Sequence, residues 1–594
     1  MLCNYANLHT GPILLTHYRL SLISDSTIHF FLQMSSNMNI DKFFKRIGSF
    51  GRYQILFIII LSPLQALFPS WQVLSPVFIM YEPQHRCKTV SNVSIPIQKD
   101  GTFSKCSMYN ETNMYLNETT TCEKGWEYDI SKNAVTLVSE LNLVCDKAIL
   151  APNAVSIMFC GVLFGALSSG QLSDMFGRKM VAWVGMVGWS VVGIGIAFTH
   201  SYIIFVIMWF ILAMCVAATF SSIFILILEL FPPEQRSTAS CISPVFWGTG
   251  LCLLAPIGYL FQNWRYFQLA ITFPVILFLP GWWFVVESPR WLQSQGRMSD
   301  LKKVLVKMAK FNGVDPDFIN EDQDECKPNE NTKKVNCSVR VPGTKPNISD
   351  EETNDVIQLK SKRTYTFMDT VRTSRLRIVT IVLSYMWFVN SLVYYGLSLN
   401  SSSLAGNRFV NFFIIGVADV AAHLFTLWAL PRFARRRLAL VFHVIASVGC
   451  VLTTAIPQET DDGKDLTILI IAVAFIGKCC ITVTFALVWV YTSEIYPTVI
   501  RNIGLGECST MARIGGMCAP YIMYTGRSIT WIPMVLFATL SLFSGLVALL
   551  LSETLNRPLP ETIKDGEDFK NVKPVTLAYS PTPAEDLDYN STKI

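Results

Sequence analysis

The chain has 594 residues, of which 51% are hydrophobic and only 15% are charged. A soluble globular protein carries about 25% charged residues, so a soluble fold could not cover its surface with these side chains. The mean hydropathy of +0.39 indicates a membrane protein, and a net charge of only +5 argues against binding to nucleic acid.

Residues 1–37 show no cleavable signal sequence and are interpreted as a disordered extension. Beyond them, apolar runs recur that are long enough to cross a bilayer core of ~30 Å as helices. There are twelve: 53–80, 148–169, 180–199, 202–228, 240–262, 267–286, 378–398, 409–430, 438–457, 467–492, 503–525 and 531–551. These runs lack the alternation of barrel strands, so the sequence predicts an all-α membrane protein.

The loop at 81–147 combines cysteines with glycosylation sequons. It holds four cysteines, Cys87, Cys106, Cys122 and Cys145, and three acceptor positions, Asn92, Asn110 and Asn117. This combination is typical of an oxidising compartment outside the cytoplasm. Four cysteines allow three disulfide connectivities, and the sequence does not choose among them.

Lys and Arg are more frequent in the short loops that share a side with the N-terminus. The positive-inside rule therefore places both termini and the long segment 287–377 in the cytoplasm. That segment opens with an apolar stripe ended by Gly313, which predicts a helix. Residues 321–363 and 563–594 are polar and are predicted to be disordered.

An internal repeat divides the chain into two halves. Glu229-Leu-Phe-Pro-Pro-Glu-Gln-Arg236 returns after 265 residues as Glu494-Ile-Tyr-Pro-Thr-Val-Ile-Arg501, and Glu287 returns after 266 as Glu553. Duplicated six-helix halves are typical of transporters, whose substrate site lies near the midplane. The predicted domains are a six-helix bundle at 38–286, a cytoplasmic linker at 287–377, a second six-helix bundle at 378–552 and a cytoplasmic tail at 553–594.

Between the second and third spans, Gly170-Gln-Leu-Ser-Asp-Met-Phe-Gly-Arg-Lys179 resembles the signature loop of the major facilitator superfamily. Its degraded partner is Arg432-Phe-Ala-Arg-Arg-Arg437. Together with Glu287-Ser-Pro-Arg-Trp-Leu292 and Tyr491-Thr-Ser-Glu-Ile-Tyr-Pro-Thr-Val-Ile-Arg-Asn502, these motifs resemble the organic cation, organic anion and carnitine transporters of solute carrier family 22. The resemblance implies twelve helices in two pseudo-symmetric halves.

Charged residues recur where the predicted helices meet the cytoplasm. We expect Asp174 to pair with a nearby arginine or with backbone donors. Acid and base are also expected to pair within two sets: Glu229 with Arg178 or Arg236, and Glu494 with Arg435 or Arg501. Our hypothesis is that these clusters form a cytoplasmic gate that holds the outward-open state.

Four ionisable side chains fall inside predicted spans: Asp419, His423, Lys478 and Arg513. An ionised residue at the bilayer centre costs ~2.5–3.5 kcal/mol on insertion scales, which favours cavity-lining or paired positions. Arg513 suits a carboxylate because its planar fork makes two parallel hydrogen bonds. Asp419 and Arg513 could instead neutralise each other, and Lys478 could simply brace the bundle. Glu507, also within a span, has no assigned role.

The family resemblance sharpens this choice. Cation-carrying members have Asp where this chain has Arg513, whereas anion- and carnitine-carrying members have Arg. Asp419 falls at a position that is acidic across the family, and His423 stands where classical anion carriers often have Lys. Candidate aromatic contacts for a substrate are Tyr394, Tyr395, Trp387, Trp247 and Phe485, because ring faces attract quaternary ammonium groups.

The predicted function is secondary or facilitative transport of small organic ions across the plasma membrane, with carboxylate-bearing anions or carnitine-like zwitterions favoured. An organic cation carrier is one alternative, and a non-transporting receptor on the same fold is another. No P-loop or hydrolase motif accompanies the spans, so neither an enzymatic activity nor a cofactor is predicted. The expected partners are the substrate, a coupling ion or counter-substrate, and the lipid bilayer.

Overall fold

The computed structural model describes residues 40–571 except 49, 89–94, 98–102, 110–118, 123–124, 131–133, 317–364, 403 and 405. The predicted extension at 1–37, the three sequons and the polar segment 321–363 lie outside the described residues. So does most of the tail that was predicted to be disordered.

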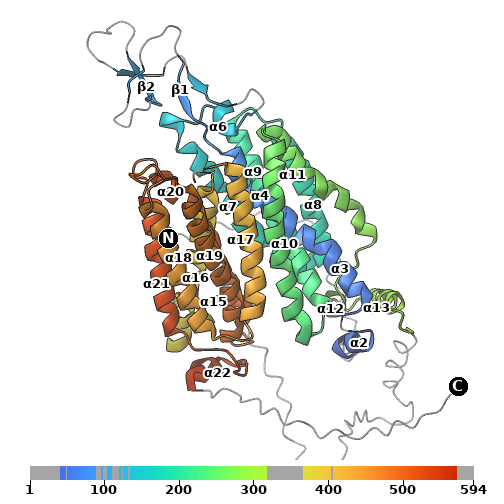
Figure 1. The fold of residues 1–594 in the computed structure, drawn as a ribbon. Helices are drawn as coiled ribbons and strands as arrows, with labels where there is room; N and C mark the ends of the chain where they lie inside the picture. Colours follow the sequence, from blue (N-terminus) through green and yellow to red (C-terminus); the bar gives the residue numbers. More distant parts are fainter. Residues whose placement is uncertain are drawn as a thin grey trace, which may run out of the picture.

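The first half of the chain forms one helical bundle, drawn in blue to green in Figure 1. Its helices are α3 (Arg52–Ser62), η1 (Pro63–Leu67), α4 (Phe68–Leu74), α5 (Pro76–Ile79), α7 (Leu150–Phe176), α8 (Arg178–Ile196), α9 (Tyr202–Glu229), α10 (Pro233–Leu260), α11 (Trp264–Phe278) and η4 (Leu279–Trp283). The first predicted span is broken into four pieces, and Pro63, Pro69 and Pro76 lie at the first or second position of the last three. Proline removes a helical donor and starts a new turn readily.

The second half forms the other bundle, drawn in yellow to red in Figure 1. Its helices are α16 (Ser374–Asn400), α17 (Arg408–Ala429), α18 (Arg435–Ala455), α19 (Thr467–Ile495), α20 (Arg501–Thr525), α21 (Ile532–Val547) and η5 (Ala548–Leu550). Within the described residues, eleven helices are long and apolar enough to cross a membrane. The predicted span that is missing from these eleven is 503–525, which corresponds to α20 (Arg501–Thr525); this helix carries Arg501, Glu507 and Arg513 and is less apolar.

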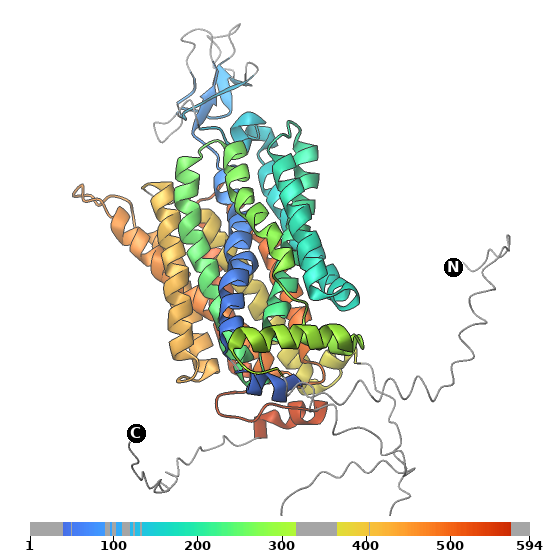
Figure 2. The same cartoon turned by 90° about the vertical axis from the view of Figure 1, so that its right-hand side faces the viewer.

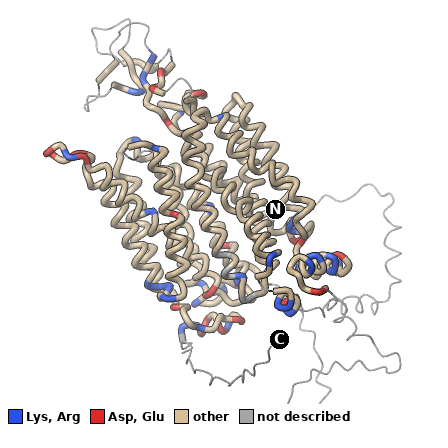
Figure 3. Tube along the Cα trace, turned by 45° about the vertical axis from the view of Figure 1, so that its right-hand side comes forward, with Lys and Arg blue, Asp and Glu red and all other residues tan. Residues whose placement is uncertain are grey.

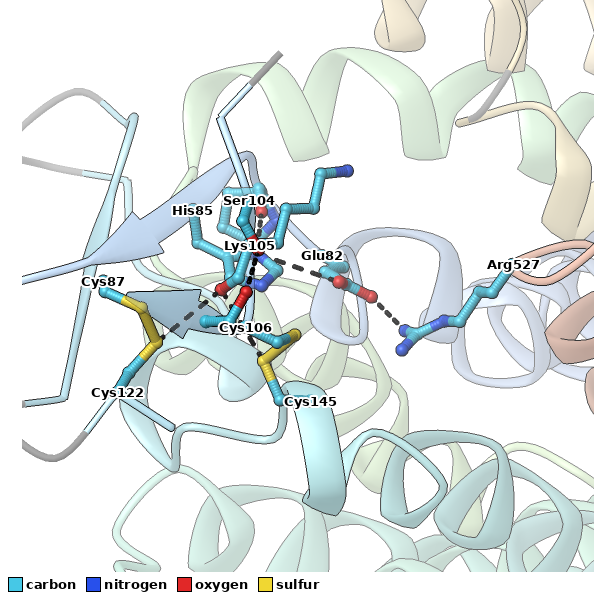
Figure 4. The surroundings of a disulfide bond; sticks show 11 residues. Glu82, His85, Cys87, Ser104, Lys105, Cys106, Cys122, Cys145 and Arg527 are labelled. Atoms are coloured by element: carbon cyan, nitrogen blue, oxygen red, sulfur yellow. Dashed lines mark hydrogen bonds and ion pairs between the residues drawn. A yellow bond between two sulfur atoms is a disulfide. The ribbon is translucent and has the colours of Figure 1, made fainter. Parts of the chain in front are cut away.

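One end of the molecule carries the loop with the cysteines, and we call it the disulfide end (Figure 1). Strand β1 (His85–Cys87) pairs antiparallel with β4 (Trp126–Tyr128), and β2 (Ser107–Tyr109) pairs with β3 (Thr119–Thr121). Helix α6 (Leu137–Glu140) and the short η3 (Cys145–Lys147) complete the loop. The disulfides are Cys87–Cys122 and Cys106–Cys145 (Figure 4). The four predicted cysteines are therefore paired in one of the three possible connectivities.

The opposite end, which we call the linker end, carries short helices that follow or precede the spans (Figure 2). They are α2 (Ile40–Arg46), α12 (Pro289–Ser294), α13 (Met298–Asn312), α15 (Phe367–Val371), α22 (Ile563–Asp568) and η6 (Phe569–Asn571). Helix α13 is the predicted linker helix, and Gly313 ends it with a φ of 78°. Figure 3 shows Lys and Arg gathered at this end of both bundles.

Helix α22 differs from the expectation that the chain is disordered from residue 563 onward. Thr562 and Asp565 form a capping box at its start, which satisfies free backbone donors of the first turn. Gly566 packs against Pro497 and Leu376. The composition of the segment is polar, but its caps and this packing order the first nine residues.

The two bundles meet through α7 with α20 and through α10 with α17. At the disulfide half of these helices the contact is close, because a Cβ added at Gly516 would lie 2.9 Å from the Phe159 ring and one at Gly416 would lie 2.6 Å from the backbone of Cys252. Toward the linker end, a Cβ at Gly170 or Gly506 would meet nothing within 4 Å. The halves therefore pack together in the disulfide half, while α7 and α20 are open at these two glycines.

Candidate functional site

A buried cluster of charged and polar side chains lies in the middle of the second half, around Asp419 of α17. Its side chain is fully buried. One carboxylate oxygen accepts a 2.6 Å hydrogen bond from Thr482 of α19, and the other accepts from the hydroxyl of Tyr394 of α16. Three helices thus supply the surroundings of one carboxylate, and both of its oxygens are occupied.

Lys478 of α19 is the counter-charge of Asp419. Its Nζ lies 3.8 Å from the Asp419 carboxylate, and its side chain is 1% exposed. The ammonium group donates to Ser398 Oγ at 2.8 Å and to the Tyr394 carbonyl at 3.2 Å. It also lies 3.1 Å from the centre of the Tyr394 ring. A buried charge persists when it is paired and hydrogen-bonded, and this pair meets both conditions.

One hydrogen bond links this cluster to the other half of the molecule. The indole N–H of Trp247, on α10, donates to the Tyr394 hydroxyl at 2.9 Å. That hydroxyl donates in turn to Asp419. A tyrosine hydroxyl can accept one bond while it donates another, so Trp247, Tyr394 and Asp419 form a continuous chain across the interface.

Arg513 of α20 is half-buried and is not the partner of Asp419. Its guanidinium donates to the Ser509 carbonyl at 2.7 Å and to the Ser509 hydroxyl, both on its own helix. Among the described residues, no acidic side chain forms an ion pair with it. The alternative in which Asp419 and Arg513 neutralise each other is therefore not the arrangement found, because Lys478 takes that role.

The remaining predicted contact residues have different surroundings. The Tyr395 ring packs edge-on against Phe159 of the other half at 4.7 Å, and Phe485 lies 5.7 Å from Tyr394. His423 is half-buried and its Nδ1 lies 2.7 Å from the Asp419 carbonyl oxygen. Trp387, by contrast, is fully buried and donates to Thr492 at 2.9 Å, so it belongs to the core of its bundle.

At the linker end of the first half, Arg178 is held by two acids. It donates to both oxygens of Glu229, at 3.0 and 3.2 Å, and pairs with Asp174 at 2.9 Å. Glu287 accepts from the backbone N–H groups of Arg178 and Lys179 and so caps α8. A Cβ at Gly177, whose φ is 101°, would lie 2.4 Å from Glu287. The signature glycine therefore makes room for this cap.

The second half repeats the cluster. Arg435 donates to both oxygens of Glu494, at 3.1 and 3.0 Å. Glu553 accepts from the backbone N–H groups of Arg435 and Arg436 and caps α18. Ala434 replaces the glycine here, with a φ of −60° that any residue adopts.

Arg236 and Arg501 do not form the acid pairs that were left open for them. Each donates from Nε to the carbonyl five residues earlier, Phe231 at 3.4 Å and Tyr496 at 3.3 Å. Burial, and secondarily the neighbouring Arg290, lower the pKa of Arg236. The ion pairs thus lie within each half and brace it, and their role in holding an outward-open state stays a prediction.

Sequence reasoning missed several polar residues that complete these clusters. Thr482 and Ser398 lie four residues after Lys478 and Tyr394, a spacing that places each pair on one helical face. Glu507, which had no assigned role, accepts from Thr370 at 3.0 Å and so ties α15 to α20. The i,i+4 spacing was a usable signal for the first two, whereas the bond between α15 and α20 had none.

Comparison with known proteins identifies the class. Residues 96–564 match the family model described as sugar (and other) transporter, and the chain belongs to this family of major facilitator transporters. The inward-open xylose transporter XylE from E. coli has the same fold, with a TM-score of 0.54 and 15% identity, covering 87% of this chain and 99% of that one.

The curated relatives are of the organic cation, carnitine and solute carrier family 22 type. An organic cation transporter protein of Drosophila melanogaster is 32% identical, covering 94% of this chain and 98% of the relative. Human organic cation/carnitine transporter 2 is 30% identical, covering 89% and 94%. Solute carrier family 22 member 6 of Danio rerio is 29% identical, covering 88% and 93%. The chain is accordingly a multi-pass membrane transporter and not an enzyme.

Proposed function

We propose that this transporter carries small organic ions that bear a carboxylate, and that Arg513 is the residue that binds the carboxylate. The observation that carries the proposal is the difference between the charges at the midplane. Asp419 is occupied by Lys478, Tyr394 and Thr482, whereas among the described residues the guanidinium of Arg513 forms hydrogen bonds only to Ser509 of its own helix.

The charge balance of the site supports an anionic group on the substrate. Asp419 and Lys478 neutralise each other, so the charge left over is that of Arg513. A guanidinium can bind a carboxylate through two parallel hydrogen bonds, which adds geometric selectivity to the charge attraction. Relatives of this chain are named as carnitine and beta-alanine transporters, and both compounds contain a carboxylate.

Aromatic rings around Tyr394 and at the interface would hold the remainder of the substrate. Tyr395, Phe485 and Trp247 are half-buried and lie at or near the interface between the halves. Small-molecule sites are mostly apolar with a few placed polar groups. His423, whose Nδ1 is engaged by a backbone carbonyl, keeps Nε2 for a polar contact.

Transport proceeds by alternating exposure of this site, in a plasma membrane with the disulfide end outside and both termini in the cytoplasm. Disulfides are typical of the extracellular side, and the excess of Lys and Arg at the linker end is typical of the cytoplasmic side. In this orientation, the arrangement in which the halves pack at the disulfide end is the one closed toward the outside.

The test is uptake into proteoliposomes by the wild type and by Arg513→Ala and Arg513→Lys. We expect Arg513→Ala to lose about 10- to 100-fold of carnitine uptake, the equivalent of ~1.5–3 kcal/mol for hydrogen bonds to a charged group. Uptake of tetraethylammonium, which has no carboxylate, should fall much less. Arg513→Lys keeps the charge without the fork and should retain part of the activity. Equal loss of both substrates would contradict the anchoring role.

An organic cation carrier is the second candidate, because relatives at 28–32% identity are named organic cation transporters. In that case Asp419 must release its partners to meet the cation. Tetraethylammonium uptake that survives Arg513→Ala but is abolished by Asp419→Asn would favour it. Binding of either compound without accumulation inside the vesicles would instead indicate a receptor.

A further inference from the structure

A basic cavity lies at the linker end of the second half, away from the midplane site. Its volume is about 420 Å³. Four of its lining residues are basic: Arg375, Arg436, Arg557 and Lys570. They come from α16, α18, the segment after η5, and η6, so four separate parts of the chain bring positive charge to one hollow.

The one acid in the cavity wall, Glu553, does not balance this charge. Its carboxylate already accepts from four backbone N–H groups, those of Arg435, Arg436, Thr554 and Leu555, at 2.9–3.1 Å. Even at full charge it would offset one of the four basic side chains. The cavity therefore keeps an excess of positive charge.

Among the residues that the structure describes, the basic side chains also have no acidic partner in an ion pair. Arg375 donates to the Leu550 carbonyl and to Ser552 Oγ, and Arg557 donates to the Phe569 carbonyl. Arg436 and Lys570 are exposed, and within the described part of the chain neither side chain forms an ion pair. The guanidinium groups of Arg375 and Arg557 are thus held by neutral oxygens, and the charge of all four side chains stays available to an anion.

The position of the cavity relates it to the bilayer. Helices α16 and α18 begin beside it, and the span Ile532–Leu550 ends at its wall. The same wall contains Leu549 and Leu550, which are 36% and 55% exposed. An apolar surface next to a basic hollow, at the level where spans leave the membrane, matches the boundary between acyl chains and headgroups.

A general excess of positive charge at the linker end does not by itself explain this cavity, because at the equivalent positions the first half has aromatic side chains in place of an open basic surface. Four residues after the capping glutamate, the first half has Trp291, which is buried, where the second has Arg557. At the second position of the capped helix, Lys179 lies 4.2 Å from the Trp282 ring, where the second half has Arg436. In the first half, Trp291 and Trp282 occupy the space near these positions. In the second half, the equivalent positions carry Arg557 and Arg436, which line an open cavity.

We infer that this cavity binds the phosphate-bearing headgroup of an anionic membrane lipid, with the acyl chains against Leu549 and Leu550. Arg and Lys make short, charge-assisted hydrogen bonds to phosphate oxygens, and basic pockets between membrane helices on the cytoplasmic side bind such headgroups. The site is separate from the substrate site, and its occupancy would hold η6 and the starts of α16 and α18 together.

The experiment measures binding of short-chain phosphatidylinositol bisphosphate to the purified full-length carrier in neutral detergent. The test variant is Arg436→Gln/Lys570→Gln. The matched control is Arg437→Gln/Lys564→Gln, which removes the same charge from exposed neighbours on α18 and α22 that do not line the cavity. We expect the test variant to bind at least 10-fold more weakly than the wild type and the control to stay within about 2-fold.

Further arms separate a lipid from a soluble phosphate. Inositol trisphosphate and inorganic phosphate should bind much more weakly than the lipid, since they do not contact the leucines, and short-chain phosphatidylcholine should not compete. Equal loss of affinity in both variants, or the absence of lipid binding, would overturn the site. Binding of inositol trisphosphate as tight as that of the lipid would overturn the assignment to a lipid.

Discussion

The two halves of this transporter share the ion-pair cluster at the linker end but differ in the polar side chains buried inside each bundle. In each half an arginine at the start of a helix forks onto a glutamate, and a second glutamate caps that helix. Inside its bundle, the first half has Gln72, Gln268 and Thr272, which are hydrogen-bonded to one another at 3.2–3.4 Å and almost fully buried. The second half has Asp419, Lys478 and Arg513.

This difference separates what the two halves of the duplicated scaffold have in common from what only one of them carries. The repeated ion pairs lie within each half and connect helices of the same bundle. The charges that we propose to select a substrate all belong to the second half, so their positions relative to one another do not depend on how the two halves pack together. The neutral amide cluster of the first half lies inside its own bundle, where it joins α4 to α11.

The sharpest test of this contrast is to disrupt the buried polar cluster of each half with one substitution. Lys478→Ala would leave Asp419 buried without a counter-charge, and we expect a loss of about 3–5 kcal/mol of stability. Gln268→Ala in the first half removes only neutral hydrogen bonds and should cost about 1–3 kcal/mol. The measurement is the midpoint of thermal unfolding of the purified carrier, with size-exclusion chromatography used to quantify the folded protein that remains after heating.

The double variant Asp419→Ala/Lys478→Ala is the control for this interpretation. It removes both charges, so it should be less destabilised than Lys478→Ala alone. If the stability loss of the double variant equalled the sum of the two single losses, Asp419 and Lys478 would not compensate each other. The contrast between the two halves would then need a different explanation.

The second prediction concerns what the halves have in common. Arg178→Ala and Arg435→Ala each remove a forked ion pair of the same geometry, and each should lower uptake by about 10- to 100-fold, as expected for ~1.5–3 kcal/mol. Arg437→Ala, next to Arg435 but exposed, is the matched control and should have little effect. A large effect in one half only would show that the clusters are not functionally equivalent.

The sequence was sufficient for the fold, the repeat and the positions where charge is costly. Burying Asp419, Lys478 or Arg513 in a membrane is expensive wherever the helices point, so these residues could be found without a structure. Their pairing could not, because it depends on the rotation and depth of α17, α19 and α20. For the same reason Trp387 could not be distinguished from the interface aromatics, since it lies on the same helix, α16, as Tyr394 and Tyr395.

The capping glutamates illustrate a different limit. The recurrence of Glu287 as Glu553 was visible in the sequence, and its spacing correctly indicated a duplication. What these acids do was not visible, because each caps a helix that begins more than 100 residues earlier in the chain. The pairing of the four loop cysteines was likewise open, because the bonded cysteines are 35 and 39 residues apart in the chain and the sequence does not show which of them meet.

The smallest predicted effect lies where the halves meet. Trp247→Phe keeps an aromatic ring at this position but removes the indole N–H that donates to the Tyr394 hydroxyl across the interface. A hydrogen bond of this kind contributes about 0.5–1.5 kcal/mol, so the population packed at the disulfide end should fall about 2- to 12-fold relative to the alternative. Spin labels at the linker end of each half would report this shift as a change in the distribution of distances.

Trp71→Phe is the matched control for Trp247→Phe. Trp71 donates to the carbonyl of Gly250 at 2.8 Å, and both residues belong to the first half. Its loss should lower stability by a similar amount without changing the distance distribution, because a bond within one half is kept in every arrangement of the two. If both variants shift the distribution, or neither does, the bond from Trp247 to Tyr394 does not couple the halves, and the charged cluster of the second half acts without reference to the first.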